Sequence, residues 1–258
     1  DKNVYEAALE RIAYCFGEFD NILVAFSGGK DSSVLLNMAY DYATENDLLH
    51  KLGMYHIDYE AQYEATTEYV EQAFIKEFKG IKKYWLCLPL AAQCAVSMYQ
   101  DHWIPWELEK KEIWVRNMPD YDCVVNEHNV PFDFRQGTWD YEVQDDFCKW
   151  FSEKNGATAV FIGIRSDESL NRFRAVSSTG RANKYKDNQY INEFGDGITY
   201  KAYPLYDWTA EDIWIANAKF GWGYNRIYDL YYMAGLSAHQ MRVASPFNDC
   251  ATDSLKLY

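Results

Sequence analysis

A six-residue run near the N-terminus combines small, hydroxyl and charged side chains in an order that suits phosphate binding. The run is Ser27-Gly28-Gly29-Lys30-Asp31-Ser32. Adjacent glycines let the backbone approach a phosphate closely, and two hydroxyls and an ammonium supply hydrogen-bond donors. A helix starting here would add unpaired backbone N–H groups and the positive end of its dipole. We therefore predict that this run, called the phosphate loop below, binds phosphate groups. The alternative is a Gly-Gly turn before a helix with Asp31 and Ser32 in its capping region.

The residues on either side of the phosphate loop predict the elements that position it. The apolar run 21–26 is typical of a buried strand, and the run after the loop places Val34, Leu35, Met38 and Tyr42 on one side of a helix. The spacing is not that of a Walker A loop, which needs four residues between its first glycine and its Gly-Lys-Ser/Thr end. The loop is therefore expected to join a strand to a helix through a different phosphate-binding turn.

Strand and helix patterns alternate along the chain, which predicts an α/β fold with a doubly wound, mostly parallel sheet. The expected strands are 21–26, 51–57, 84–88, 157–164 and 199–203, and the expected helices include 64–78, 139–154 and one opened by a capping box at 209–212. Right-handed crossovers favour the order 3-2-1-4-5 for these five strands. Ligands bind where such a sheet reverses direction, so the phosphate loop should face the loop 165–171 there.

A cluster of basic residues follows the fourth predicted strand, in a chain whose formal net charge is −14. Arginine forks suit bidentate binding of phosphate or sulfate oxygens. Arg165 and Arg172 leave the strand at the expected crevice, so they are the better candidates for anion ligands. The later residues of the cluster, Arg181, Lys184 and Lys186, fit a solvated basic face equally well.

Two aspartates add to the candidate site. Asp58 ends the second predicted strand, where its carboxylate could accept from a ribose hydroxyl or an adenine amino group, or could instead cap the helix that follows. Asp31 is unusual beside phosphates because like charges repel. A Mg²⁺ ion bridging the Asp31 carboxylate and a phosphate would remove that conflict, so the sequence implies magnesium with Asp31 as its ligand.

We expect a single domain over residues 1–258, a length that suffices for one large α/β core. Residues 89–138 break the alternation and form an aromatic-rich insertion. This insertion is either a packed helical excursion or a substrate-selecting cap over the carboxyl edge of the sheet. Residues 209–258 are expected to form a helical C-terminal region. The chain does not begin with methionine, and we expect it to be a fragment of a longer one.

Charge and apolar pattern exclude several classes of protein. The excess of 39 acidic over 25 basic residues argues against non-specific binding to nucleic acid or to an anionic membrane. Charged residues interrupt the N-terminus, which does not resemble a signal peptide, and the longest uncharged run, 84–100, falls short of a membrane span. The six cysteines contain no Cys-x-x-Cys pair, so we expect buried thiols in a cytoplasmic protein and no iron–sulfur cluster.

The phosphate loop resembles the PP-loop of the N-type ATP pyrophosphatases. Three further runs resemble the phosphoadenosine phosphosulfate (PAPS) reductase-like branch of that superfamily, namely 163–169 with Arg172, 203–214 and 225–235. The runs 103–106, 114–116 and 241–247 look closest to the IbrA-like proteins. Those proteins are typically paired with a ParB-like protein, so the resemblance implies a partner of that kind.

The resemblance implies an adenine nucleotide alpha hydrolase-like fold that binds ATP or a related adenine nucleotide. It further implies cleavage of the bond between the α and β phosphates, with an acceptor adenylated and pyrophosphate released. The catalytic residues that it implies are Lys30, Asp31 and Arg165. The nucleotide-binding residues that it implies are Ser27, Gly28, Gly29, Lys30, Asp31, Ser32, Asp58, Gly163, Arg165 and Arg172.

One departure from the family bears on its sulfur chemistry. PAPS reductases carry a C-terminal Glu-Cys-Gly-x-His element whose thiolate attacks the sulfonate, whereas Cys250 here has no following histidine. We therefore interpret the chain as an adenylating enzyme. The alternatives are a sulfonucleotide reductase, with a thiol from Cys250, from a missing tail or from a partner, and a nucleotide-sensing co-activator that acts through a partner protein.

Overall fold

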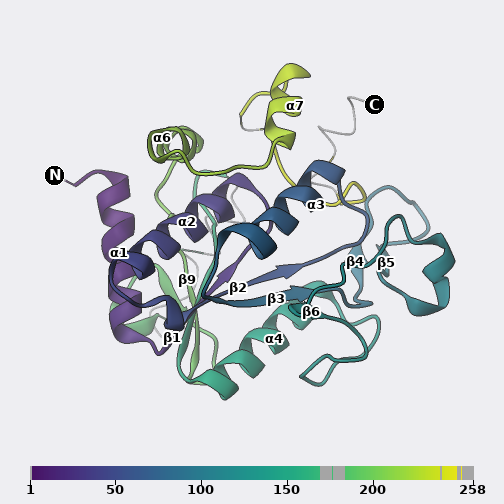
Figure 1. Cartoon of the computed structure of the whole chain (residues 1–258), viewed down its shortest axis with the longest axis horizontal. Coiled ribbons are helices and arrows are strands. Elements are labelled where there is room, and N and C mark those ends of the chain that lie inside the picture. The colour runs from purple at the N-terminus through teal and green to yellow at the C-terminus, as the bar shows by residue number, and fades with distance from the viewer. Residues whose placement is uncertain (1, 169–175, 177–183, 239, 249–250, 252–258) are drawn as a thin grey trace. The chain divides into compact units, whose positions relative to one another are not determined.

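The computed structural model describes residues 2–168, 176, 184–238, 240–248 and 251 (Figure 1). The chain divides into two compact units. The first contains Asp1–Met54, Glu77–Lys82 and Cys148–Tyr224, and the second contains Tyr55–Lys76, Lys83–Phe147 and Asn225–Tyr258. The predicted insertion at 89–138 belongs entirely to the second unit. The single domain expected from chain length stays a prediction.

A seven-stranded sheet has the order β6-β3-β2-β1-β7-β9-β8. Its strands are β1 Asn21–Ala25, β2 Leu52–Ile57, β3 Lys82–Leu86, β6 Val124–Val125, β7 Thr158–Phe161, β8 Ile191–Glu193 and β9 Thr199–Ala202. Strand β7 pairs in parallel with β1 and with β9, β6 pairs in parallel with β3, and β8 is antiparallel to β9. The α/β fold class and the order 3-2-1-4-5 are confirmed, because they correspond to β3-β2-β1-β7-β9. The predicted count of five strands is wrong, because two short edge strands extend the sheet.

Local sequence explains the helices of the first unit. They are α1 Val4–Glu18, α2 Lys30–Glu45 and α6 Ala210–Phe220, and α2 packs against both of the others. The side chains that α2 buries include Val34, Leu35 and Met38, the face expected from their spacing. The predicted helix at 139–154 is α4 Asp140–Asn155, which runs from the second unit into the first.

The start of α6 confirms the capping box expected from Thr209 and Asp212. The Thr209 hydroxyl accepts from the Asp212 backbone N–H at 3.2 Å, and the Asp212 carboxylate accepts from the Thr209 backbone N–H at 2.8 Å. Thr209→Ala should lower the free energy of unfolding by about 1 kcal/mol, because it leaves a helix N–H without its partner. Urea denaturation measures this loss. Thr209→Ser keeps the hydroxyl and should recover most of it.

The second unit contains α3 Glu64–Glu71, which continues as a π-helical turn at Gln72–Glu77, and α7 Ile227–Met233. The insertion 89–138 contains the hairpin β4 Ala92–Gln93 with β5 His102–Trp103, a 3-10 turn at Leu108–Ile113, and β6. No α-helix forms between residues 89 and 138, all of which the structure describes. The interpretation of this insertion as a packed helical excursion is therefore wrong. Prolines 105, 119 and 131 divide the segment into stretches that favour turns.

None of the helices in the described part of the chain is both long and apolar enough to cross a membrane.

Candidate functional site

The phosphate loop follows β1 directly and ends in the first turn of α2. Helix α2 starts at Lys30, and no side chain caps its N-terminus at Gly29. The Ser27 and Ser32 hydroxyls lie 3.0 Å apart, and the Ser32 hydroxyl donates to the Gly29 carbonyl at 3.0 Å. Asp31 and Ser32 lie in the first turn of α2, where the alternative placed them, but neither side chain caps the N-terminus. The N-terminus of α2 instead keeps the anion-favouring end of its dipole at the loop.

Backbone geometry explains the glycines at this site. Gly28 has a φ of +75°, which L-residues with a Cβ rarely adopt, whereas Gly29 has an ordinary φ of −83°. A Cβ on Gly163, in the loop after β7, would lie 2.9 Å from the backbone nitrogen of Ser32. That distance is shorter than a real Cβ contact. The two loops that follow the adjacent strands β1 and β7 therefore touch through backbone, as the switch point of the sheet predicts.

Arg165 is the cation that the structure brings to the phosphate loop. Its side chain is only 3% exposed, its Nε donates to Asp31 Oδ1 at 2.5 Å, and its Nη1 donates to Asp167. Burial lowers the pKa of the guanidinium, but the neighbouring carboxylates outweigh burial and raise it, so Arg165 stays charged. Lys30 is buried as well, with its Nζ 3.1 Å from Asp31 Oδ2.

These contacts do not fit the prediction that Asp31 is a magnesium ligand. Each carboxylate oxygen of Asp31 already contacts a cation, Lys30 on one side and Arg165 on the other. The same two cations balance the charge that made Asp31 unusual beside a phosphate. No cluster of three or more histidine, cysteine or carboxylate side chains suited to a metal occurs among the described residues.

The later residues of the basic cluster differ from Arg165. Lys184 donates to two backbone carbonyls and to Asn192, and Lys186 is an exposed cation paired with Glu18. The partners of Lys184 include Asn192 in β8, and the partner of Lys186 is in α1. Neither lysine contacts the phosphate loop through these interactions. Arg172 and Arg181 lie outside the described residues, so their roles as anion ligands stay predictions.

Asp58 is buried in the second unit, with 1% of its surface exposed. Its carboxylate accepts from the Trp85 indole N–H at 2.7 Å, from the Glu60 backbone N–H at 2.8 Å and from Arg116. Tyr63, not Asp58, precedes the first residue of α3, and no side chain caps that helix. The capping alternative for Asp58 is therefore wrong. Its role in nucleotide binding stays a prediction.

Asp167 is the residue that sequence reasoning missed at this site. In the structure its carboxylate accepts from the Arg165 Nη1, while that of Asp31 accepts from the Arg165 Nε. Its place two residues after Arg165 is the signal that could have found it. One buried arginine between two carboxylates is a group whose position is set before any ligand arrives.

Comparison with known proteins supports the resemblance in part. Residues 116–234 match the family profile of the phosphoadenosine phosphosulfate reductase domain. The uncharacterized protein YbdN of Escherichia coli (strain K12) is 35% identical over 262 residues, which cover 99% of this chain and 62% of YbdN. The chain thus spans less than two thirds of that relative.

Solved structures are similar at the level of the fold. FMN adenylyltransferase of Candida glabrata, in complex with FMN and the ATP analogue AMPCPP, aligns with a TM-score of 0.52 at 14% identity, covering 91% of this chain and 60% of that one. PAPS reductase of Candida auris, in a phosphate complex, aligns with a TM-score of 0.49 at 15% identity, covering 93% of this chain and 88% of that one. The chain therefore has the fold of an adenylyltransferase structure and, over residues 116–234, sequence similarity to the PAPS reductase domain.

Proposed function

We propose that the phosphate loop binds ATP or a related adenine nucleotide. We further propose that the protein transfers the adenylyl group of this nucleotide to an acceptor. The observation that carries this proposal is the backbone approach at the start of α2. Gly28 has a positive φ, and Gly163 leaves no room for a side chain beside Ser32. Such a turn at an uncapped helix N-terminus, next to Lys30 and Arg165, suits the β and γ phosphates of a nucleotide.

The proposed reaction is a displacement at the α-phosphorus. An oxygen of the acceptor forms a bond to the α-phosphorus, and the bond from that phosphorus to the bridging oxygen breaks, so pyrophosphate leaves with the electron pair. Lys30 and Arg165 stabilise the charge that develops on the phosphates, and Asp31 positions both cations. The likeness in fold to an adenylyltransferase that binds an ATP analogue supports this reaction class by analogy only.

Sulfonucleotide reduction is the second candidate, because residues 116–234 match the PAPS reductase domain. It needs a thiol, and Cys250 lies outside the described residues. Burial raises the pKa of Cys15 and of Cys87, which keeps both thiols protonated and unsuited to nucleophilic attack. The predicted regulatory role with a ParB-like partner, the IbrA-like assignment and the magnesium requirement stay predictions.

Titration of the purified protein with ATP, adenosine phosphosulfate and PAPS separates these candidates. Each nucleotide is added with Mg²⁺ and with a chelator, and binding heat, pyrophosphate and sulfite are measured. We expect ATP binding and pyrophosphate release in the wild type. Sulfite from PAPS with thioredoxin as reductant would favour the reductase, and binding with neither product would favour a nucleotide sensor. If none of the three nucleotides binds, the proposed function is wrong.

A further inference from the structure

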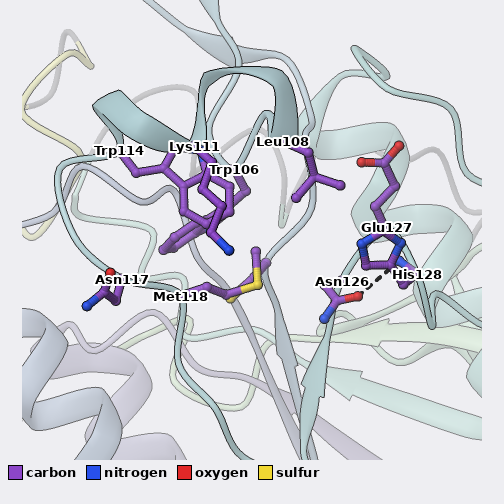
Figure 2. Close-up of a pocket in the computed structure, with 10 residues that line it drawn as sticks. Trp106, Leu108, Lys111, Trp114, Asn117, Met118, Asn126, Glu127 and His128 are labelled. Carbon is purple, nitrogen blue, oxygen red and sulfur yellow. Dashed lines mark hydrogen bonds between the residues drawn. The ribbon is translucent and has the colours of Figure 1, made fainter.

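The second unit contains a pocket of about 250 Å³ in its insertion (Figure 2). Its lining residues are one residue directly after β3 and nine from the segment 106–128. They are Cys87, Trp106, Leu108, Lys111, Trp114, Asn117, Met118, Asn126, Glu127 and His128. The volume is smaller than the roughly 300–1,000 Å³ typical of drug-sized ligands, so it suits a molecule of one or two rings. The phosphate loop contributes no residue to it.

Trp106 forms a buried wall of this pocket in a strained conformation. It is 1% exposed and has a φ of +54°, which is a genuine outlier for a bulky residue. Its backbone N–H donates to Glu60 Oε2 at 2.7 Å, and its indole N–H donates to the Asp58 carbonyl at 2.8 Å. Two hydrogen bonds to buried partners, one from the backbone and one from the indole ring, thus hold Trp106 in this unfavourable backbone conformation.

Glu60 and Arg116 complete the support for this wall. Glu60 itself has a φ of +62°, and its second carboxylate oxygen accepts from the Val115 backbone N–H at 3.0 Å. Arg116 donates from Nε to the Glu60 carbonyl at 2.9 Å, and its guanidinium lies 4.9 Å from the centre of the Trp106 ring. The wall is therefore preorganised, which lowers the entropic cost of binding a ligand against it.

Trp114 supplies a second aromatic surface. Its ring meets the Trp106 ring edge-on, with centroids 5.1 Å apart and an interplanar angle of 87°. The Trp114 indole N–H donates to the Glu107 carbonyl at 3.0 Å, so the polar atoms of both indoles are already engaged by protein. Because only 1% of Trp106 is exposed, the flat carbon surface on which a planar ligand ring can stack belongs to the half-buried Trp114.

Lys111 places a cation in the same pocket. Its ammonium lies 5.8 Å from the centre of the Trp114 ring, and both side chains line the pocket (Figure 2). No carboxylate forms an ion pair with Lys111 in the described part of the chain, whereas its neighbour Lys110 pairs with Glu107 at 2.6 Å. A cation beside aromatic surface, without a protein counter-ion, is suited to an anionic group on the ligand.

We propose that this pocket binds a small planar aromatic carboxylate. Its ring would stack on Trp114, which packs against the buried Trp106, and its carboxylate would pair with Lys111. The lining residue Glu127, beside a single lysine, disfavours a ligand with several negative charges, such as a nucleotide. The site is distinct from the phosphate loop, and the inference does not rest on the proposed adenylyl transfer.

The test measures binding of benzoate, nicotinate and indole-3-carboxylate, each beside its neutral amide, by calorimetry and ligand-detected NMR. We expect at least one acid to bind the wild type about tenfold more tightly than its amide, as one partly exposed charge-assisted contact allows. Lys111→Gln should remove that preference. Lys110→Gln is the matched control and should keep it, as should Gly28→Val, which alters only the phosphate loop.

A second variant tests the aromatic wall. Trp114→Leu should abolish binding of the acid, and Trp114→Phe should retain most of it, with thermal denaturation showing that both variants fold. Absence of saturable binding for all three acids would overturn the proposal. Equal affinity for acid and amide, or a preference that survives Lys111→Gln, would overturn it as well.

Discussion

Replacing Gly28 by valine should remove detectable nucleotide binding and leave the protein folded. A β-branched residue at a φ of +75° is sterically unfavourable, and its side chain would occupy the space through which the backbone meets a phosphate. Both effects act at the turn between β1 and α2. Calorimetric titration with ATP measures the loss of affinity, and circular dichroism checks the fold.

A valine substitution at a second glycine with a positive φ separates the effect of backbone strain from the effect of altering the phosphate loop. Gly197 has a φ of +79°, and a Cβ there would meet no heavy atom within 4 Å. Gly197→Val therefore introduces the same kind of backbone strain at an exposed position and should leave ATP affinity unchanged. Gly29→Val adds a side chain to the same turn at an ordinary φ, so it should also weaken binding without that strain. Wild-type affinity in Gly28→Val would show that the loop does not hold the phosphates.

Arg165→Ala should weaken nucleotide binding or turnover by about 2–3 kcal/mol, equivalent to a loss of roughly 30- to 150-fold. The substitution removes a charge-assisted contact to a phosphate. It also leaves the Asp31 carboxylate with one fewer cation, and that negative charge then repels the nucleotide. Dissociation constants and kcat/KM for ATP give the loss. Thermal denaturation reports the accompanying cost of removing a buried ion pair.

Two further variants identify the origin of that loss. Lys186→Ala removes an exposed cation that pairs with Glu18 and should leave the affinity for the nucleotide almost unchanged. Asp31→Asn in the Arg165→Ala background should restore part of the affinity, because it removes the repulsion but not the missing contact. Complete restoration would mean that Arg165 only balances Asp31. Equal, small effects at Arg165 and Lys186 would mean that neither binds phosphate.

Local patterns were enough to predict the middle of the sheet and the start of α6. Four of the five predicted strands contain a run of apolar residues, 199–203 being the exception, and the Thr209 capping box is decided within one turn of helix. Strands β6 and β8 are two and three residues long, too short to give a periodic signal. Their place at the sheet edges comes from pairing with a neighbouring strand, which a linear pattern does not contain.

The candidate site likewise has some features that the sequence predicts and others that only the folded structure shows. The hexapeptide and the switch point predicted that the loops after β1 and β7 meet, and the close approach of Gly163 to Ser32 confirms it. The ion pair between Asp31 and Arg165 joins residues 134 positions apart, so only the folded chain shows that these charges neutralise each other. The burial of Asp58 under Trp85 and Arg116 likewise depends on contacts with distant segments.

The pairing of Lys30 and Arg165 with Asp31 also affects how fast a nucleotide arrives. Both cations already share a carboxylate, so the loop offers little outward positive field to draw a polyanion from solution. The chain as a whole repels it, with a net charge of −14. Association should therefore lack electrostatic steering and quicken as salt screens the repulsion, with a Debye length of about 10 Å at 0.1 M. The affinity for the nucleotide would then depend on a slow dissociation rate rather than on a fast association rate.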